Sequence, residues 1–436
     1  SRGLGDVYKR QVLSNSIWMI LEKVISIFGL IFVTSYVAKY IGPANFGKIS
    51  YVASIFIIIQ AICNFGSEYL LFRRVSQNPI SGRRLIHSTA VMRHLLFFIL
   101  SLGVLFYLQI NSDHVTFIFG IATAVAYYFA TIDVVAVYNN ATLNSKINTI
   151  CNVIGLVTSL LIRYVIVLYK LDILFLSLPI ILVTLVPYLL RRYLYRKEHS
   201  RTHGFHKAKF RNKLRYSRYM FMAGIPLAIS SVSVIIYARI TQFVIMHFGG
   251  DAELGIFSVA SQLATAWMFI TTSIITSYYS KIYAESNKDK AALMVARLHG
   301  LIFMISVFVI FNIVLFGKWV VHILYGEAYE TAYPIMLILC VNSLFSAMVP
   351  IVNKYIVYDS GYAYLSKKTV AVAVVTIPIA IFLTKLHGVE GAAFSTVVTE
   401  FLSLTIFNYF FKSAVVLKIQ ISSLKPSTYK IVSKYE

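Results

Sequence analysis

The chain has 436 residues, of which 58% are hydrophobic and only 13% are charged, and its formal net charge is +23. An ordinary soluble domain has about 25% charged residues, so a soluble fold of this size would lack the charged surface that it needs. A nucleic-acid-binding protein is rich in charge, and this chain is poor in it. The composition therefore predicts an all-α integral membrane protein that crosses the bilayer many times.

The N-terminal segment is set apart from the rest of the chain. It contains no initiator Met, and residues 4–11 resemble translated sequencing-adapter read-through. We therefore expect residues 1–13 to be a non-native or disordered N-terminal segment, and we exclude it from the fold reasoning.

Long apolar stretches then follow one another along the chain. A spanning helix needs about 20 mostly apolar residues, because the hydrocarbon core is about 30 Å thick and each residue rises about 1.5 Å. This rule predicts about 12 transmembrane helices, near 14–40, 47–71, 86–110, 115–139, 147–169, 171–192, 219–248, 254–279, 298–317, 333–357, 367–385 and 391–412. We expect two six-helix bundles, at 14–192 and 219–413, with a basic cytoplasmic linker at 193–218 and a cytoplasmic tail at 414–436.

Lys and Arg residues fall mainly on one set of connections between the predicted spans. The connection at 193–218 is the most basic, and Arg191 and Lys368 are counted with this set too. Because the cytoplasmic loops of membrane proteins carry an excess of Lys and Arg, both termini are predicted to be cytoplasmic. The basic connection could also attract anionic lipid headgroups, although a role in topology alone explains its charge.

One short pattern occurs twice. Residues 42–50 (GPANFGKIS) match residues 250–258 (GDAELGIFS), and each copy lies in the turn between the first and second predicted spans of its half. Each half has an even number of spans, so the two copies share one orientation. We therefore predict a parallel repeat, related by an axis along the membrane normal.

Charged residues also occur inside the predicted spans. Each costs about 2.5–3.5 kcal/mol to insert, so such groups normally face a water-filled interior. Arg and Lys facing a cavity suit an anionic phosphate group. The candidate substrate-binding cations are Lys23, Arg93, Arg163, Arg239 and Lys354, and the candidates for ion pairing or proton coupling are Glu22, Asp133 and Glu400.

Less specific explanations exist for these charges. Lys354 and Arg163 could reach a helix end by extending their long side chains. Arg93, Arg239 and Asp133 lie deeper, where pairing within the bundle would also account for them.

Signals of catalysis are missing from the sequence. No Walker A sequence, Gly-rich dinucleotide turn or GxSxG motif is present. Cys63, Cys151 and Cys340 lie in apolar stretches, as expected of small packing residues. We therefore expect no enzyme activity, no catalytic residues, no cofactor and no metal site.

Several motifs follow one another in a characteristic order and spacing. They are 15–18 (NSIW), 40–47 (YIGPANFG), 66–73 (GSEYLLFR), 224–227 (GIPL), 237–242 (YARITQ), 254–260 (LGIFSVA), 323–329 (ILYGEAY) and 387–393 (HGVEGAA). In these motifs the chain resembles the polysaccharide and O-antigen flippases of the multidrug/oligosaccharidyl-lipid/polysaccharide exporter superfamily.

The resemblance implies two six-helix bundles, alternating access and a position in the cell inner (plasma) membrane. It implies as substrate a short oligosaccharide, an O-antigen or capsule/exopolysaccharide repeat unit of polysaccharide or lipopolysaccharide biosynthesis, on undecaprenyl pyrophosphate. A glycan polymerase and a chain-length regulator of the same pathway are possible partners, together with membrane lipids, and no nucleic acid is expected. Thr241 departs from the family pattern, which often has Asp there, so a coupling carboxylate is lacking at that position.

Two other functions stay open at this point. One is an ion-coupled multidrug or cation antiporter of the same superfamily, for which an acidic, aromatic cavity would be expected. The other is a membrane glycan polymerase, although such enzymes usually carry a large periplasmic loop and the outer loops here are short.

Overall fold

The computed structural model describes residues 2–64, 67–200, 210–426 and 428, and every regular element among them is helical. Nine helices in this part of the chain are long and apolar enough to cross a membrane, or ten if the bent pair Gly250–Thr265 and Met268–Tyr283 is one span. The prediction of an all-α multi-pass membrane protein is confirmed. The count is lower than the expected 12, because two of the nine stretches, of 44 and 48 residues, are each about twice the length of one span.

The helices follow each other with short connections. They are α1 (Arg2–Asn64), α2 (Ser67–Gln77), α3 (Pro79–Asn111), α4 (His114–Ile132), α5 (Val135–Ala141), α6 (Ser145–Leu168), η1 (Ile173–Leu176), α7 (Ser177–Ser200), α8 (Phe210–Phe248), α9 (Gly250–Thr265), α10 (Met268–Ala284), α11 (Lys288–Tyr325), η2 (Glu327–Tyr329), α12 (Ala332–Tyr358), α13 (Tyr362–Leu404), α14 (Ile406–Tyr409) and α15 (Val415–Ser423).

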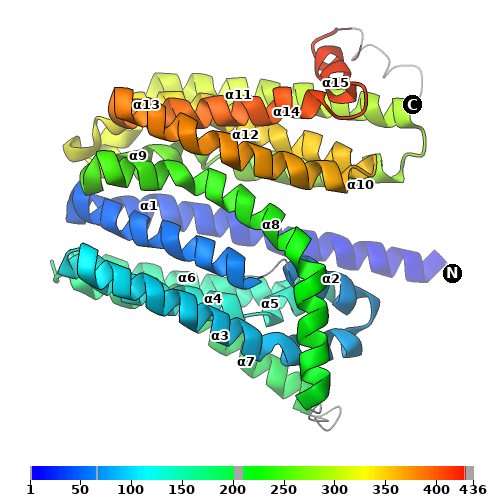
Figure 1. The fold of residues 1–436 in the computed structure, drawn as a ribbon, viewed down its shortest axis with the longest axis horizontal. Coiled ribbons are helices and arrows are strands. Elements are labelled where there is room, and N and C mark those ends of the chain that lie inside the picture. Colours follow the sequence, from blue (N-terminus) through cyan, green and yellow to red (C-terminus); the bar gives the residue numbers. More distant parts are fainter. Residues whose placement is uncertain (1, 65–66, 201–209, 427, 429–436) are drawn as a thin grey trace. The chain divides into compact units, whose positions relative to one another are not determined.

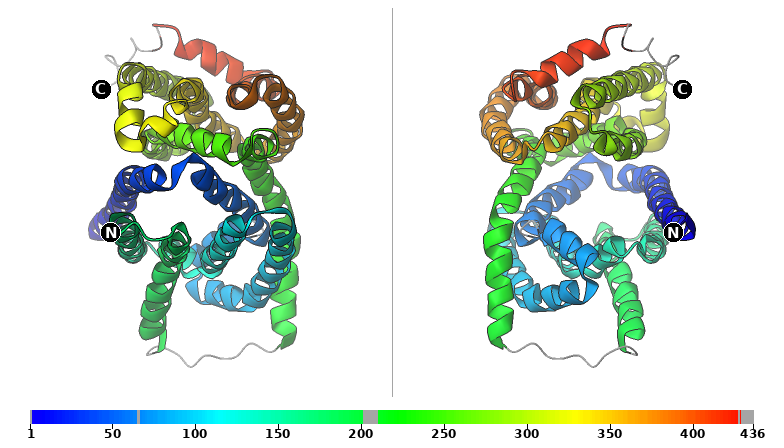
Figure 2. Two further views of the ribbon diagram at one scale, coloured as in Figure 1. Left: turned by 90° about the vertical axis from the view of Figure 1, so that its left-hand side faces the viewer. Right: turned by 90° about the vertical axis from the view of Figure 1, so that its right-hand side faces the viewer.

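The chain divides into two compact units. The first contains Ser1–Gly42 and Lys48–Ile235, and the second contains Pro43–Gly47 and Ile236–Glu436. Most helices of each unit are seen end-on in Figure 2, so within a unit they run roughly parallel or antiparallel. The division falls inside α8, and the boundaries expected for the two bundles stay a prediction.

The predicted N-terminal segment at 1–13 and the predicted linker at 193–218 are both partly helical. The backbone of 1–13 is helical from Arg2 onward, while its non-native origin stays a prediction. Helices α7 and α8 both enter the predicted linker at 193–218, of which residues 201–209 lie outside the described part of the chain.

The two longest helices are kinked at glycine. Gly42 in α1 has φ 75°, and Gly388 in α13 has φ 57°, in the left-handed region that glycine adopts without steric cost. Both helices double back at these positions, as the blue and orange ribbons of Figure 1 show. Each kink lies between two predicted spans.

The duplicated sequence forms a reciprocal contact inside the second unit. A Cβ atom on Gly47 would lie 1.8 Å from the carbonyl oxygen of Asp251, and one on Gly255 would lie 2.0 Å from the carbonyl oxygen of Pro43. Gly47 and Gly255 are equivalent positions of the pattern, and so are Pro43 and Asp251. The two backbones therefore approach each other symmetrically, at a distance that only glycine permits.

Asparagine caps begin two of the long helices. The Asn78 side chain accepts a hydrogen bond from the Ser81 backbone N–H at 3.1 Å, just ahead of Pro79 at the start of α3. The Asn287 side chain accepts from the N–H of Asp289 and Lys290 at the start of α11. Both satisfy backbone donors that a helix start leaves free.

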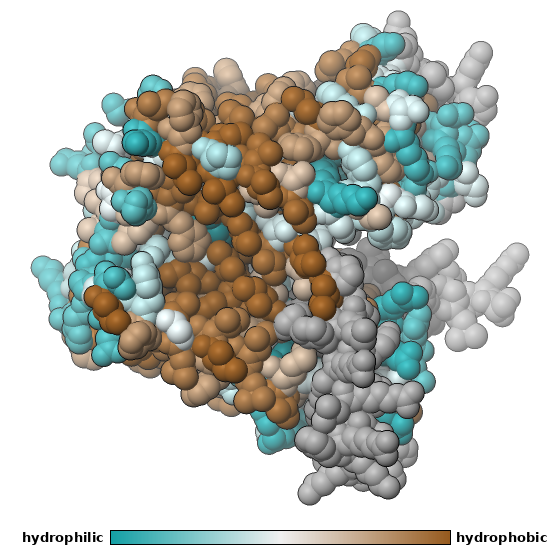
Figure 3. Space-filling model, viewed as in Figure 1, coloured by the Kyte–Doolittle hydropathy of each residue, from teal (hydrophilic) through white to brown (hydrophobic). Residues whose placement is uncertain are grey.

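The apolar side chains are distributed as a membrane requires. In the second unit α10, α11, α12 and α15 enclose one large core that includes Tyr279, Ile302 and Tyr355. Many other large apolar side chains are exposed, Phe106 and Phe308 among them. On the face drawn in Figure 3 hydrophobic side chains cover the middle of the helices, and hydrophilic side chains gather toward the helix ends. Such a surface is suited to contact with lipid.

Candidate functional site

A hydrogen-bonded network of charged groups crosses the interior of the first unit. Asp133 lies where the chain passes from α4 to α5, and its Oδ2 atom accepts from Arg191 Nε at 2.8 Å and lies 2.5 Å from Arg191 Nη2. Arg191 Nη1 donates to Asn152 Oδ1 at 2.6 Å, and Asn152 Nδ2 donates to Glu22 Oε1 at 2.7 Å. The network thus links α1, α6, α7 and the α4–α5 junction.

This network corrects the placement of Arg191. The basic connection after the sixth predicted span was expected to contain Arg191, but its side chain is only 7% exposed and is paired with Asp133. The reason is that α7 continues as a helix to Ser200. The sequence contained a signal for this inward position, because Tyr188, Arg191 and Tyr195 recur at helical spacing. The structure shows that all three are buried.

Arg93 on α3 has a different environment. Its side chain is 1% exposed, and Nη2 donates to Thr89 Oγ1 at 2.6 Å on the same helix. Its Nε is buried without a hydrogen-bond partner among the described residues, and no described carboxylate forms an ion pair with it. A buried guanidinium without a counter-charge is suited to receive an anion.

A row of aromatic side chains begins at His94, the next residue along α3. His94 Nδ1 lies 3.0 Å from the Tyr128 hydroxyl, and the Tyr128 ring contacts Phe129 at 5.3 Å between centroids. Phe129 contacts Tyr188 at 5.3 Å, and the Arg192 guanidinium lies 5.5 Å from the Tyr188 ring. Rings and cations in such a row offer both stacking and charge to a polar ligand.

The other two candidate cations of the first unit are less buried. Arg163 is half-buried, and Nη1 donates to Thr34 Oγ1 at 3.4 Å. Lys23 is exposed, although a place inside the bundle was expected. Arg93 and Arg163 donate to different hydroxyl groups, those of Thr89 and Thr34, and no partner shared by the two is described.

In the second unit a carboxylate and an ammonium are buried together. Glu400 on α13 has a buried Oε2 atom without a hydrogen-bond partner among the described residues, and its carboxylate interacts with the Ser346 hydroxyl and electrostatically with Lys368. Lys368 is 4% exposed and donates from Nζ to Asn353 Oδ1 at 3.0 Å. Ser346 and Asn353, both on α12, thus supply a neutral polar group to each of the two side chains.

Lys368 was also expected in a basic connection, and that placement is wrong. Helix α13 begins at Tyr362, so Lys368 lies well inside it. Lys368, Val372, Thr376, Ala380 and Thr384 recur every four residues and are all buried. This row could have assigned Lys368 to the inward face of the helix.

The other two candidate cations, Arg239 and Lys354, each have one described partner. Arg239 is half-buried, and Nη1 donates to Gln242 Oε1 at 3.3 Å. Lys354 is half-buried with Nζ 5.6 Å from the Tyr279 ring, a cation–π contact between α12 and α10. Thr241 is buried, and its hydroxyl has no partner among the described residues.

Metal-binding and thiol chemistry are not indicated by the described residues. No group of three or more His, Cys, Asp or Glu side chains in this part of the chain could hold a metal ion. The three cysteines are free and buried.

Comparisons with known proteins identify the family and the fold. The family model described as polysaccharide biosynthesis protein matches residues 12–279. No curated protein is significantly similar to the chain.

Among solved structures, the chain is similar to the lipid II flippase MurJ in an inward closed conformation, with a TM-score of 0.67, 14% identity, and coverage of 97% of this chain and 93% of that chain. It is also similar to an inward-facing multidrug resistance MATE transporter of the MOP superfamily, with a TM-score of 0.65, 14% identity, and coverage of 97% and 99%. A MOP superfamily transporter from Pyrococcus furiosus matches with a TM-score of 0.56, 15% identity, and coverage of 96% and 97%. The chain belongs to the polysaccharide biosynthesis protein family and has the fold of the MOP superfamily.

Proposed function

We propose that this protein is a transporter, not an enzyme, that flips an undecaprenyl-pyrophosphate-linked oligosaccharide across the plasma membrane. The cargo is an O-antigen or capsule/exopolysaccharide repeat unit, which moves from the cytoplasmic to the periplasmic face by alternating access. Membership of the polysaccharide biosynthesis family supports the glycan, and similarity to a lipid II flippase supports a lipid carrier. A glycan and a pyrophosphate cannot cross hydrocarbon unaided.

The proposal includes 12 spans in two parallel-repeat bundles with both termini cytoplasmic. Each arm of the kinked helices α1 and α13 is then one span, and the bent pair α9–α10 is another. The symmetric contact of Gly47 and Gly255 supports the repeat.

The observation that supports the substrate proposal most strongly is the burial of Arg93. Its guanidinium is buried without a described carboxylate partner, and such a charge is costly to retain unless it has a ligand. Arg keeps its charge and offers several donors, which suits a pyrophosphate. The half-buried rings of Tyr128 and Phe129 offer stacking surfaces for the sugars. Arg163, Arg239, Lys354 and Lys23 are proposed as further contacts of the head group or glycan.

The three candidate carboxylates divide into one for proton coupling and two for ion pairing. Glu400 carries an unpartnered buried oxygen and is influenced electrostatically by Lys368, so we assign to it a proton that moves on and off during a transport cycle. Glu22 and Asp133 belong to the Arg191 network, which suits ion pairing that holds the first unit together. A cation antiporter is the alternative, and it is less suited to a unit in which Arg93 has no counter-charge.

The test uses purified full-length protein in liposomes that contain a lipid-linked oligosaccharide. Movement of the glycan to the opposite leaflet is followed by its accessibility to a glycosidase. We expect Arg93→Gln to slow movement about 100-fold, Arg93→Lys to retain part of it, and Glu400→Gln to remove its response to a pH gradient. Equal movement in liposomes with and without the protein would reject flipping.

The matched control for Arg93 is Arg84→Gln. Arg84 lies on the same helix but is exposed, so its loss should leave the rate within about twofold of wild type. Uptake of a cationic dye driven by a proton gradient, with no glycan movement, would establish the antiporter instead.

A further inference from the structure

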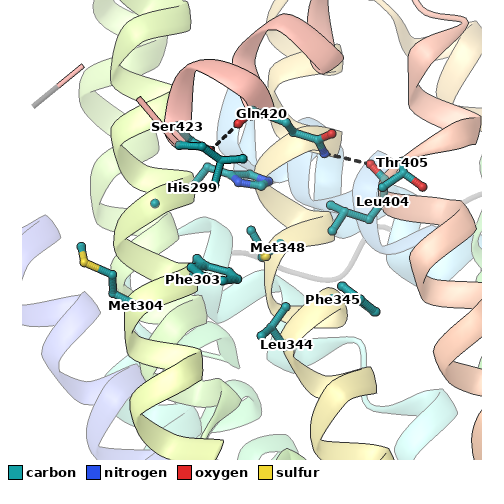
Figure 4. A pocket seen from close by; sticks show the side chains of 12 residues that line it. His299, Phe303, Met304, Leu344, Phe345, Met348, Leu404, Thr405, Gln420 and Ser423 are labelled. Carbon is teal, nitrogen blue, oxygen red and sulfur yellow. Dashed lines mark hydrogen bonds between the residues drawn. The ribbon is translucent and has the colours of Figure 1, made fainter. Parts of the chain in front are cut away.

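The second unit contains a cavity that the proposed transport cycle does not use. It has a volume of about 440 Å³, in the range of sites for small ligands. Helices α11 and α12, the end of α13 and α15 form its walls (Figure 4). Its apolar lining includes Phe303, Met304, Leu344, Phe345 and Met348, and its polar lining is His299, Thr405, Gln420 and Ser423.

His299 gives this cavity a buried polar group that can bind a ligand. Its side chain is 4% exposed, and its Nε2 atom is buried without a hydrogen-bond partner among the described residues. Buried polar atoms are nearly always partnered, so an unpartnered one at a cavity indicates a missing ligand. Figure 4 shows the imidazole extending from α11 beneath Gln420, whose own Nε2 donates to the Leu404 carbonyl at 3.0 Å.

The sequence of α11 gives the depth of the cavity in the membrane. About 20 residues without an acidic or basic (Lys or Arg) side chain separate Arg297 from Lys318, which matches the hydrocarbon thickness of about 30 Å. Arg297 therefore lies at one membrane boundary, and His299 lies about 3 Å further in. Phe303 and Met304 line the cavity and are also exposed, so the cavity is open toward lipid. This is the depth at which phospholipid headgroups meet their chains.

The boundary around the cavity is positively charged. Helix α15 packs Val416 and Ile419 inward, and Lys418 and Lys425 flank the residues that line the cavity. The sequence has no acidic residue between Glu400 and the C-terminal Glu436. No described carboxylate pairs with Arg297, Lys418 or Lys425. Basic groups beside a helix at the membrane surface attract anionic lipids.

We propose that this cavity binds one anionic phospholipid, phosphatidylglycerol, as a structural lipid of the second unit. One acyl chain lies among Phe303, Leu344 and Phe345, and the polar end of the lipid reaches His299 and Gln420. Arg297, Lys418 and Lys425 surround the phosphate. Phosphatidylethanolamine has no net charge, so these cations select against it. The site is separate from the candidate cations of the transport path and does not depend on what the protein transports.

The test is native mass spectrometry of delipidated full-length protein titrated with phosphatidylglycerol or with phosphatidylethanolamine of the same chains. Wild type should bind one phosphatidylglycerol about tenfold more tightly than phosphatidylethanolamine. Ser423→Phe fills the cavity and should weaken this binding about tenfold. Ile421→Phe puts the same ring on an exposed position of α15 and should leave it unchanged. Lys418→Gln with Lys425→Gln leaves the cavity open and should remove only the preference for phosphatidylglycerol.

Several outcomes would overturn the proposal. Equal binding of the two lipids to wild type would show that charge is not recognised. Phosphatidylglycerol binding that survives both the filling and the charge variants would place the lipid elsewhere on the protein. Tighter binding of a polyprenyl phosphate than of phosphatidylglycerol would make this a site for the carrier lipid. The Tm of each variant is measured alongside, so that a loss of binding in a folded protein is distinguished from unfolding.

Discussion

Arg93 and Arg191 are both buried in the first unit, but only Arg191 has a described carboxylate partner. Arg191 is held by Asp133 and Asn152, whereas the described partner of Arg93 is the neutral hydroxyl of Thr89. A buried ion pair roughly offsets its own desolvation, but a lone buried cation does not. We therefore infer that Arg191 serves the fold and that Arg93 serves a ligand.

Removal of one partner of the pair should destabilise the first unit. Asp133→Asn leaves Arg191 buried without a counter-charge, and loss of one partner of a buried pair costs about 3 kcal/mol. We expect a lower Tm in thermal unfolding of the detergent-solubilised protein. Asp133→Leu combined with Arg191→Met should recover much of the loss, because no unpaired charge is then buried.

Asp172→Asn is the matched control for this change. Asp172 is an exposed carboxylate outside the long helices, where its side chain accepts from the Leu174 N–H, and Asn keeps that acceptor. Its Tm should equal that of wild type. An unchanged Tm for Asp133→Asn would show that the pair adds nothing to stability.

At the scale of elements, the close approach of the two repeat copies should depend on glycine. Gly47→Ala and Gly255→Ala each place a methyl group about 2 Å from a backbone carbonyl, and backbone cannot move aside as a side chain can. We expect each variant to lower the Tm markedly. The double variant should be less destabilised than the sum of the two, because both act on one reciprocal contact.

Gly103→Ala is the control for glycine replacement in general. Gly103 lies within α3, and a Cβ atom there would meet no neighbouring part of the described chain within 4 Å. Ala should therefore leave stability equal or higher by virtue of its helix propensity. A Tm as low as that of Gly47→Ala would argue against the close contact as the cause.

Asp359, at the end of α12, contacts the start of α11 and the turn between α14 and α15. Its carboxylate accepts from Lys288 Nζ at 2.7 Å and lies 2.8 Å from Lys412 Nζ. Burial alone would raise the pKa of Asp359, but the hydrogen bonds from the two lysines outweigh it and lower the pKa on balance. Because the folded pKa lies below the unfolded value of about 3.9, the stabilisation is complete above that pH and is lost as the pH falls through the folded pKa.

The contribution of this contact can be measured from the change of the Tm with pH. We expect the Tm to fall as the pH drops below about 4, and Asp359→Asn to have a lower Tm at pH 7 with a smaller fall on acidification. High salt should weaken the contact, since Lys288 and Lys412 are largely exposed. Glu390→Gln, at an exposed position of α13, should retain the wild-type curve. Parallel curves for Asp359→Asn and wild type would contradict a role for this carboxylate.

For the whole molecule, apolar length predicted the long helices because the membrane fixes the length of a span, but it did not predict short helices such as α5 and α15. The pattern at 42–50 and 250–258 also predicted where two chain reversals fall. The count of loop charges placed Arg191 and Lys368 at the surface, because it assigns every cation near a predicted span end to a loop. The helical spacing of the residues around them was the signal that indicated an inward face. Partners such as Asn152 and Asn353 are neutral and lie on other helices than these cations, so only folding brings them together.

The repeat also predicts which side of the membrane each turn faces. Ala44 and Ala252 are equivalent exposed positions of the two copies, and Ser286 is exposed between α10 and α11. The native cysteines are buried, so introduced cysteines should dominate labelling. In intact spheroplasts an impermeant maleimide should label Ala44→Cys and Ala252→Cys, and should reach Ser286→Cys only after permeabilisation. A parallel repeat requires both turns on one side, so labelling of only one of the two would contradict it, and labelling of Ser286→Cys alone would reverse the proposed orientation.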